Sequence, residues 1–218
     1  MSILKKDKKK KLIILGGYGV GMIVASMAES FYDYHIIGFL NDKIKINSKI
    51  GIKKKYKIVG KIKDIVKYLN DENTYFFNSI IDYKNKKSNF KIPAKKLVSI
   101  IHPNINYNPD TVKISKNVLI CSNVTLSTDV IIKDGVKIMS NAFVGHNTIL
   151  KKNAFIAAGA VIGGTVVIDK EAFIGLNSTI IEKIKVGRNS ILGAGSVLTK
   201  NLTSNKTFFG NPAKIKQN

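Results

Sequence analysis

Arginine and cysteine are almost absent from this chain of 218 residues. The scarcity of arginine argues against one class of protein, and that of cysteine against one kind of cross-link. Arg188 is the only arginine among 36 basic residues. A specific nucleic-acid reader normally uses several arginines for bidentate contacts, so that class of protein is disfavoured. Cys121 is the only cysteine, which excludes an intrachain disulfide and fits a reducing cytoplasm.

Acidic residues are also few, 14 against 36 basic ones, which gives a net charge of +22. A charge of this size first suggests nucleic acid or an anionic membrane as partner. Here it is nearly all lysine, in a chain that is also rich in isoleucine and asparagine. We therefore interpret it as a solvated lysine-rich surface that attracts small anionic ligands, and we expect no nucleic-acid partner.

Long uninterrupted apolar runs are missing as well. The basic start and the segment "LIILGGYGVGMIVASMA" imitate a signal peptide, but four glycines interrupt the apolar run and a strand-like segment follows it. No other stretch approaches the ~18 apolar residues that span a bilayer. We expect a cytoplasmic protein without membrane insertion.

A glycine-rich turn stands near the start of the chain. "KLIIL" at 11–15 predicts a buried strand, "GGYGVG" a turn, "MIVASMAESF" a helix and "YHIIGFL" a second strand. Gly16, Gly19 and Gly21 follow the spacing G-x-x-G-x-G, which places backbone N–H groups where a phosphate could sit. A tight turn without a ligand explains the glycines equally well. Asp42, after the second strand, is a candidate acceptor for a ribose or base, or a residue that closes the strand.

The rest of the first hundred residues predicts more α/β structure. Ile62, Ile65, Val66 and Leu69 have helical spacing, and "TYFFNSIID" reads as a third strand. We predict a small Rossmann-like α/β domain with a short parallel sheet over residues 1–100. The segment "IIHPN", with Pro103, marks the boundary.

A six-residue period begins at Val112. Its aliphatic position is occupied by Ile, Leu or Val in all fifteen repeats, for which chance agreement is on the order of 10⁻⁷. These residues are Ile114, Ile120, Leu126, Ile132, Ile138, Val144, Leu150, Ile156, Ile162, Ile168, Ile174, Ile180, Val186, Leu192 and Leu198. The period predicts a parallel β-helix of about five coils over residues 101–200, followed by a tail at 201–218.

The register of the repeat also locates His146, the one histidine of this region. It falls two residues after the inward Val144, in a turn, so we predict that it points outward. A step of ~18 residues per coil places it beside Thr128 and Gly164. A glycine beside it would leave room for a ligand to approach the backbone. A single histidine disfavours a zinc enzyme, which needs three or four ligands.

The segments "LIILGGYGVG", "IIGFLND", "IIHP", "ILGAGSVLTKN" and "FFGNPAK", together with the hexads, carry a family resemblance. The chain resembles the sialic acid O-acetyltransferases and the nucleotide-amino-sugar N-acetyltransferases, which are left-handed β-helix, hexapeptide-repeat acyltransferases. The resemblance implies a homotrimer with acyl-CoA bound between neighbouring subunits, no metal, and a nucleotide sugar held by the N-terminal domain. The product would enter glycan, O-antigen or capsule synthesis.

The resemblance also implies roles for particular residues. His146 would be the general base, with residue 147 orienting it. The turn residues Gly16, Gly17, Tyr18, Gly19 and Gly21 would line the nucleotide pocket, with Asp42 at the ribose or base and Met139 at the sugar. The acyl-CoA positions would be Phe155, Gly164, Leu176, Ala194, Asn211 and Pro212, with the Gly164 N–H facing the thioester oxygen.

Four positions depart from the family pattern. Asn147 stands where an acid usually orients the base, and Asp129, one coil earlier, is a candidate substitute. Phe155 replaces a second histidine, Met139 an asparagine that contacts the sugar, and Val20 a histidine of the glycine turn. These departures leave the sugar open.

We hypothesise an acetyl-CoA-dependent N-acyltransferase that acts on a nucleotide-linked amino sugar. The alternatives are a sugar O-acetyltransferase of the sialic-acid type and a non-catalytic β-helix assembly or binding protein.

Overall fold

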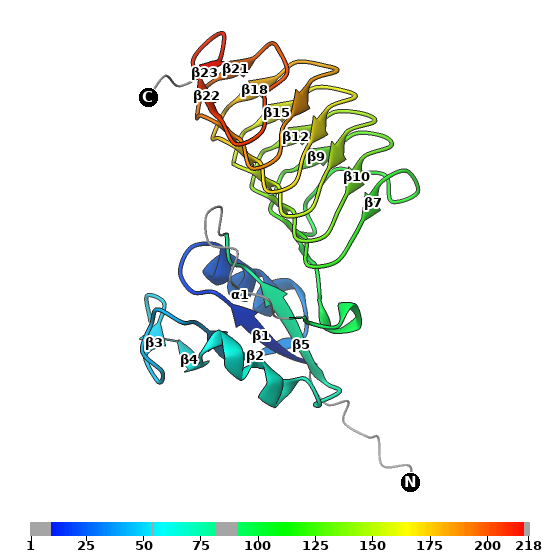
Figure 1. The fold of residues 1–218 in the computed structure, drawn as a ribbon. Coiled ribbons are helices and arrows are strands. Elements are labelled where there is room, and N and C mark those ends of the chain that lie inside the picture. Colours follow the sequence, from blue (N-terminus) through cyan, green and yellow to red (C-terminus); the bar gives the residue numbers. More distant parts are fainter. Residues whose placement is uncertain (1–9, 54, 82–90, 216–218) are drawn as a thin grey trace. The chain divides into compact units, whose positions relative to one another are not determined.

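The protein is described by a computed structural model over residues 10–53, 55–81 and 91–215 (Figure 1). The chain divides into two compact units, Met1–Val98 and Ser99–Asn218. The resemblance also implies a helix after the third predicted strand, and this segment falls largely on residues 82–90, outside the described residues.

The N-terminal unit is a five-stranded sheet with the strand order β3-β4-β2-β1-β5. The four parallel strands are β1 Lys10–Leu15, β2 Tyr34–Leu40, β4 Tyr56–Gly60 and β5 Thr74–Asn78. The short strand β3 Lys49–Ile50 adds an antiparallel edge, and α1 Val20–Phe31 links β1 to β2. The predicted small α/β fold is confirmed, while β3 and β4 had no clear signal in the sequence.

The second predicted helix takes a different form. It is a 3₁₀ helix, η1 Ile62–Tyr68, and a second short one is η2 Ala94–Lys96. Ile62 and Ile65 are buried, but Val66 is 63% exposed. A 3₁₀ helix aligns residues three apart, so the 62/65 pair packs on the sheet and the i+4 residue does not. The prediction of an amphipathic α-helix was wrong for that reason.

The C-terminal unit is a parallel β-helix, visible in Figure 1 as a stack of coils. Its strands lie on three faces. The β7 sheet holds β7 Lys113–Ile114, β10 Ile131–Ile132, β13 Ile149–Leu150, β16 Val167–Ile168 and β19 Lys185–Val186. The β9 sheet holds β9 Thr125–Leu126, β12 Phe143–Val144, β15 Val161–Ile162, β18 Thr179–Ile180 and β21 Val197–Leu198.

The third face, the β8 sheet, is longer than the other two. It holds β6 Ile100–Ile101, β8 Leu119–Ile120, β11 Lys137–Ile138, β14 Phe155–Ile156, β17 Phe173–Ile174, β20 Ile191–Leu192, β22 Thr207–Phe209 and β23 Lys214–Ile215. β6 precedes the fifteen hexads, and β22 and the antiparallel β23 follow them. The solenoid therefore exceeds the predicted five coils, because segments without the hexad pattern also join it.

The inward side chains of the hexads form one continuous core. Fourteen of the fifteen aliphatic residues are buried, and Ile114, at the first coil, is half-buried. Polar residues at inward positions are satisfied: the Thr148 hydroxyl donates to the Gly163 carbonyl at 3.1 Å and the Ser178 hydroxyl to the Gly175 carbonyl at 2.8 Å. A buried hydroxyl with a partner avoids the desolvation penalty of an unpaired one. The core therefore holds the turns in a fixed register.

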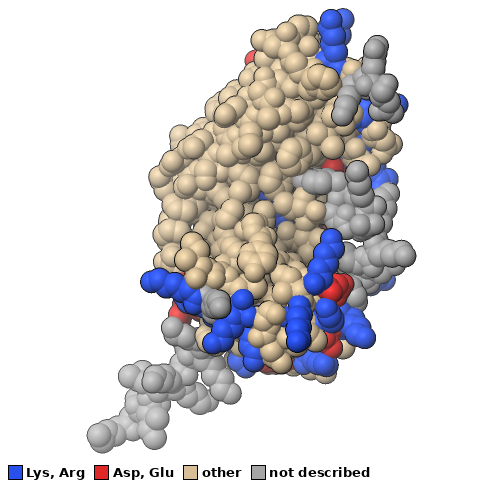
Figure 2. All heavy atoms as spheres, turned by 90° about the vertical axis from the view of Figure 1, so that its left-hand side faces the viewer, with Lys and Arg blue, Asp and Glu red and all other residues tan. Residues whose placement is uncertain are grey.

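Charge is unevenly distributed over the surface in Figure 2. Lysines gather on the N-terminal unit, and the visible face of the β-helix carries few charged side chains. Within the described residues, no helix is both long enough and apolar enough to cross a bilayer.

Candidate functional site

Each coil of the β-helix makes three turns, so its turns stack into three corners. The His146 corner, between the β9 and β7 sheets, contains residues 127–129, 145–147, 163–165 and 181–183. The Leu176 corner, between the β8 and β9 sheets, contains 139–141, 157–159, 175–177 and 193–195. The Arg188 corner, between the β7 and β8 sheets, contains 115–117, 133–135, 151–153, 169–171 and 187–189.

Every sixth residue of these turns has a left-handed backbone. Among the fourteen such positions from 117 to 195, seven are Asn (Asn117, Asn123, Asn141, Asn147, Asn153, Asn177 and Asn189) and three are Gly (Gly135, Gly159 and Gly195). Asparagine and glycine tolerate positive φ better than other residues. Asn147, with φ of 56°, therefore occupies a position where the turn itself favours asparagine.

The Asn147 side chain also contacts the candidate base. Its Oδ1 lies 2.8 Å from His146 Nδ1. An amide oxygen only accepts, so this contact requires a proton on Nδ1 and leaves Nε2 with a free lone pair in the neutral ring. The contact therefore performs one of the two tasks of the usual acid, because it fixes the tautomer of the imidazole. It supplies no negative charge.

Gly164 makes space for the histidine ring. His146 is exposed, as predicted, and its imidazole covers the α-carbon of Gly164 on the next coil. A Cβ at Gly164 would collide with Nε2 and lie only 2.6 Å from Cε1. The imidazole therefore occupies the space that a side chain at Gly164 would take. In the described part of the chain, the Gly164 N–H has no acceptor.

Asp129 does not contact the pair. It is exposed and takes the left-handed turn position one coil before Asn147, with φ of 59°. Among the described residues its carboxylate has no hydrogen bond to His146 or Asn147. The ring leans the other way, over Gly164.

The predicted acyl-CoA and sugar residues lie elsewhere on the β-helix. Leu176 (54% exposed), Ala194 and the half-buried Met139 belong to the Leu176 corner. Phe155 is 9% exposed on the β8 sheet and stacks on Phe173 with ring centroids 5.1 Å apart. Within one chain the whole β9 sheet separates the Leu176 corner from the His146 corner.

The tail continues the stack at the Leu176 corner. Gly210 N–H donates to the Ser196 hydroxyl at 3.0 Å, and Ala213 N–H donates to the Val197 carbonyl at 2.7 Å. Asn211 and Pro212, joined by a cis peptide bond, are exposed between these contacts.

The glycine turn of the N-terminal unit is mostly packed. Added Cβ atoms at Gly16 and Gly21 would meet the Ser79 hydroxyl, and one at Gly17 would meet Asn41 Nδ2 at 2.9 Å. Only Gly19, with φ of 68°, faces open space, next to Tyr18, which is 67% exposed.

Two residues to which the sequence pattern assigns no role hold this turn. Asn41 Nδ2 donates to the Gly16 carbonyl at 2.9 Å, and the Ser79 hydroxyl donates to the Leu15 carbonyl at 2.6 Å. Both directly follow parallel strands, which was the available signal. Asp42 Oδ1 accepts from the Ile62 N–H at 2.9 Å, so this carboxylate starts η1. The N-terminus of α1 has no side-chain cap and no acidic residue in its first turn.

No group of three or more metal-ligating side chains forms among the described residues. The only buried thiol described, that of Cys121, has its pKa raised to about 11 by burial, which makes it a poor nucleophile.

Comparisons with known families agree with both units. The model of the PglD N-terminal domain matches residues 11–92, the bacterial transferase hexapeptide model matches 129–164, and the succinyl-transferase hexapeptide model matches 165–200. The chain is a bacterial hexapeptide-repeat transferase by class. In this chain the match to the PglD N-terminal domain precedes the matches to the hexapeptide repeats, which is the order expected of the predicted acyltransferase family.

Solved structures share the complete fold. A histidine-to-asparagine mutant of perosamine N-acetyltransferase from Caulobacter crescentus, in complex with CoA and GDP-perosamine, is 22% identical, with a TM-score of 0.85 and coverage of 95% of this chain and 97% of that one. The acetyltransferase domain of PglB from Neisseria gonorrhoeae, in complex with acetyl coenzyme A, is 24% identical (TM-score 0.81; coverage 96% and 100%). WeeI from Acinetobacter baumannii is 18% identical (TM-score 0.75; coverage 94% and 99%). A comparison with curated proteins finds no match.

Proposed function

We propose that this protein transfers an acetyl group from acetyl-CoA to the amine of a nucleotide-linked amino sugar. The observation that carries the proposal is the geometry of His146, whose Nδ1 is held by Asn147 while Nε2 is left as the basic nitrogen. Acyl transfer needs such a base, and an imidazole in this role typically contributes ~10²–10⁴-fold.

The reaction proceeds in two stages. The sugar amine attacks the thioester carbon while His146 Nε2 takes a proton from the amine nitrogen, which forms the N–C bond and an imidazolium. The oxyanion is stabilised by the Gly164 N–H, which has no acceptor within the described residues. When the C–S bond breaks, the thiolate of CoA leaves and receives the proton from the imidazolium.

In this proposal the protein is a homotrimer, and each acyl-CoA site is formed by the His146 corner of one subunit and the Leu176 corner of its neighbour. The separation of these two corners within one chain supports a shared site. The exposed apolar residues Phe143 (39%), Val161 (43%) and Ile181 (44%), on or just after strands of the β9 sheet, also support it, since they offer apolar area for a neighbouring subunit.

The nucleotide is held in this proposal by the N-terminal unit. The uncapped N-terminus of α1 and the open backbone at Gly19 suit an anionic diphosphate, with Tyr18 beside it. Asp42 accepts the ribose or base through its second carboxylate oxygen, because Oδ1 is engaged by Ile62. The perosamine and PglB structures, whose ligands are CoA, GDP-perosamine and acetyl coenzyme A, support the substrate classes.

The substrate is tested with the wild-type protein, acetyl-CoA and a panel of GDP-, UDP- and dTDP-linked amino sugars that includes GDP-perosamine. Release of free CoA thiol is measured, with matched sugars that carry a hydroxyl in place of the amine as controls. Acetylation of an amine acceptor is the expected result. Transfer only to hydroxyl sugars would support the O-acetyltransferase, and no transfer at all the non-catalytic alternative.

The shared site is tested by complementation. His146→Ala and Leu176→Arg subunits are co-expressed and assayed at an acetyl-CoA concentration well below the raised KM of Leu176→Arg, where each variant alone has little activity. If each site takes His146 from one subunit and Leu176 from its neighbour, random mixing restores about a quarter of wild-type activity. A site within one chain predicts no restoration.

A further inference from the structure

Among the residues that the structure describes, the His146 ring has a neutral partner and no charged one. Asn147 fixes the tautomer through Nδ1, but its amide carries no charge. No ion pair involves His146 among the described residues. Proton transfer to Nε2 creates an imidazolium, and a nearby negative charge stabilises that state. A negative side chain at the same corner would therefore stabilise the imidazolium.

The ring points along the stack toward the coil of residues 181–183. It covers Gly164, one coil beyond His146. The next coil follows in the same register, because the Lys183 N–H donates to the Gly164 carbonyl at 3.0 Å, as the Thr165 N–H does to the His146 carbonyl at 2.7 Å. A Cβ at Gly163 would lie 2.8 Å from the Glu182 backbone nitrogen. Glu182 is therefore the next residue of the stack that the ring approaches.

Glu182 is within reach of the ring without any backbone movement. Neighbouring coils are ~4.8 Å apart, and a glutamate carboxylate extends about as far from its own backbone. Because the imidazole already spans the coil of Gly164, rotation of the exposed Glu182 side chain brings its carboxylate to roughly 6 Å or less from Nε2.

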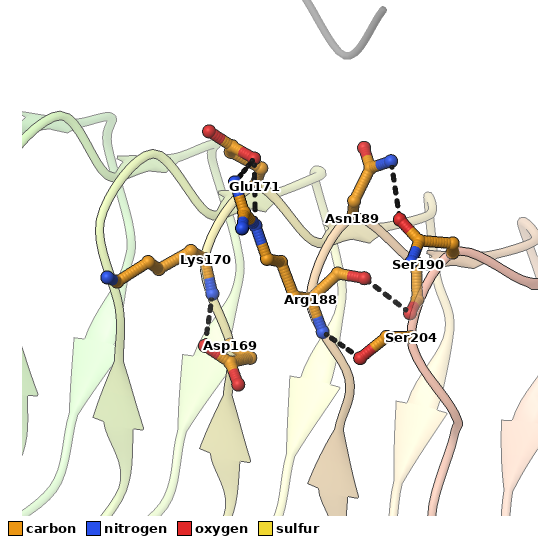
Figure 3. Close-up of polar contacts among 8 residues, drawn as sticks. Asp169, Lys170, Glu171, Arg188, Asn189, Ser190 and Ser204 are labelled. Carbon is orange, nitrogen blue, oxygen red and sulfur yellow. Dashed lines mark hydrogen bonds and ion pairs between the residues drawn. The ribbon is translucent and has the colours of Figure 1, made fainter.

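Glu182 also differs from the acids of the Arg188 corner, which all have partners. There, Glu171 pairs with Arg188 at 3.2 Å, and Asp169 accepts from the Lys170 N–H at 2.7 Å (Figure 3) and pairs with Lys151 at 3.3 Å. The carboxylate of Glu182 has no hydrogen bond or ion pair in the described part of the chain. Its charge is thus available to the His146 corner.

We propose that Glu182 is a positioning residue of the acetyl transfer. Its carboxylate supplies the negative charge that stabilises the His146 imidazolium, a charge that the neutral Asn147 does not supply. The role of Glu182 in catalysis rests on the proposed function. The carboxylate stays ionised throughout. It favours the state in which Nε2 holds the amine proton, before that proton passes to the CoA thiolate.

Three other charges near the ring qualify the effect. The step of ~18 residues per coil places the exposed Lys200 one coil beyond Glu182, on the side away from the ring. Lys183 follows Glu182, and its ammonium opposes the carboxylate at the ring. Asp129 lies on the opposite side, one coil before His146, and the ring leans away from it. Asp129 is therefore the matched control: it is an exposed acid at the same corner, without a partner among the described residues, and its coil lies two spacings of ~4.8 Å from the coil of Gly164 that the ring covers.

The experiment is an NMR titration of the histidine ring protons in wild-type protein, Glu182→Gln and Asp129→Asn at 0.1 M salt. His146→Ala assigns the signals among the three histidines. Coulomb's law with screening predicts that Glu182→Gln moves the His146 titration midpoint down by about 0.3 of a pH unit, and Asp129→Asn by less than about 0.1. Lys183→Gln should move it in the opposite direction.

Equal shifts in Glu182→Gln and Asp129→Asn, or no shift in either, would overturn the proposal. Both substitutions are on exposed side chains without partners, so both variants should fold. The titration needs no substrate, so its outcome is separate from that of the acetyl-transfer assay. A Glu182-specific shift in a protein that transfers no acetyl group to any sugar would refute the proposed function and, with it, the catalytic role.

Discussion

Replacing Gly164 by alanine tests whether the position of the His146 ring matters. The new Cβ would lie 2.6 Å from Cε1 of the imidazole, whereas ordinary contacts begin at 3.4 Å. Because Nε2 would lie closer still, the ring must move by at least about 0.8 Å, or rotate away from Gly164. Either movement strains the 2.8 Å contact between Nδ1 and Asn147 that fixes the tautomer.

The expected magnitude is large for activity and small for stability. A misplacement of about 1 Å in a reacting group can cost ~10²-fold, so we expect a loss of about 50- to 100-fold in kcat. The backbone at Gly164 does not have positive φ, so alanine is compatible with it. Alanine also restricts the unfolded chain, and the free energy of unfolding should change by less than ~1 kcal/mol.

Gly145→Ala is the contrasting variant. Its Cβ would lie 2.6 Å from backbone atoms of Gly163 and Gly164, which cannot move aside as a side chain does. We expect this variant to lose stability by several degrees in Tm or not to fold. Steady-state acetyl transfer and thermal unfolding are measured for both variants. Wild-type kcat in a folded Gly164→Ala protein would refute the role of the ring position.

Three further predictions concern residue 147, a buried lysine and the Leu176 corner. Asn147→Asp should fold, because Asp129 already occupies the equivalent left-handed turn position one coil earlier. The new carboxylate is a charged acceptor for His146 Nδ1 and should raise kcat by about fivefold. An unchanged kcat would show that charge at this position is unimportant. Burial lowers the pKa of Lys137 from 10.5 to about 8, so the unfolded chain binds more protons between these values. The free energy of unfolding of wild type should therefore rise by about 3 kcal/mol relative to that of Lys137→Met between pH 8 and 10.5. Denaturant titrations at several pH values measure this difference. The prediction is wrong if the two proteins show the same dependence of unfolding free energy on pH. Leu176→Arg should raise KM for acetyl-CoA at least about tenfold with an unchanged Tm, since Leu176 is 54% exposed; an unchanged KM would remove this corner from the acyl-CoA site.

The architecture of the β-helix was predictable because one periodic signal specifies it. Each hexad commits its aliphatic residue to the core, and agreement over fifteen repeats leaves no other fold. The ends of the stack were not predictable, because β6 and β22 pair with it without the hexad pattern. The form of η1 was missed because its apolar spacing fits both an α-helix and a 3₁₀ helix at residues 62 and 65.

At the candidate site, the register placed His146 outward and beside Gly164 correctly. It could not give the rotamer of the ring, which places the imidazole where a side chain at Gly164 would lie. By comparison with the family pattern, Asn147 replaces an acid and offers no charge to the imidazolium. In the structure, the left-handed turn supplies a separate reason for asparagine, which a comparison of the turn positions could have suggested. The engagement of Asp42 by Ile62 depends on a contact across 20 residues, which no local pattern reveals.

The central claim is that His146 is the base of an acetyl transfer, and its most direct test is the turnover rate of His146→Ala. The side chain is exposed, so the variant should keep its Tm and its affinity for acetyl-CoA. With saturating acetyl-CoA and an amino-sugar acceptor used by the wild type, we predict that kcat falls by ~10²–10⁴-fold. A kcat equal to that of the wild type would contradict the account.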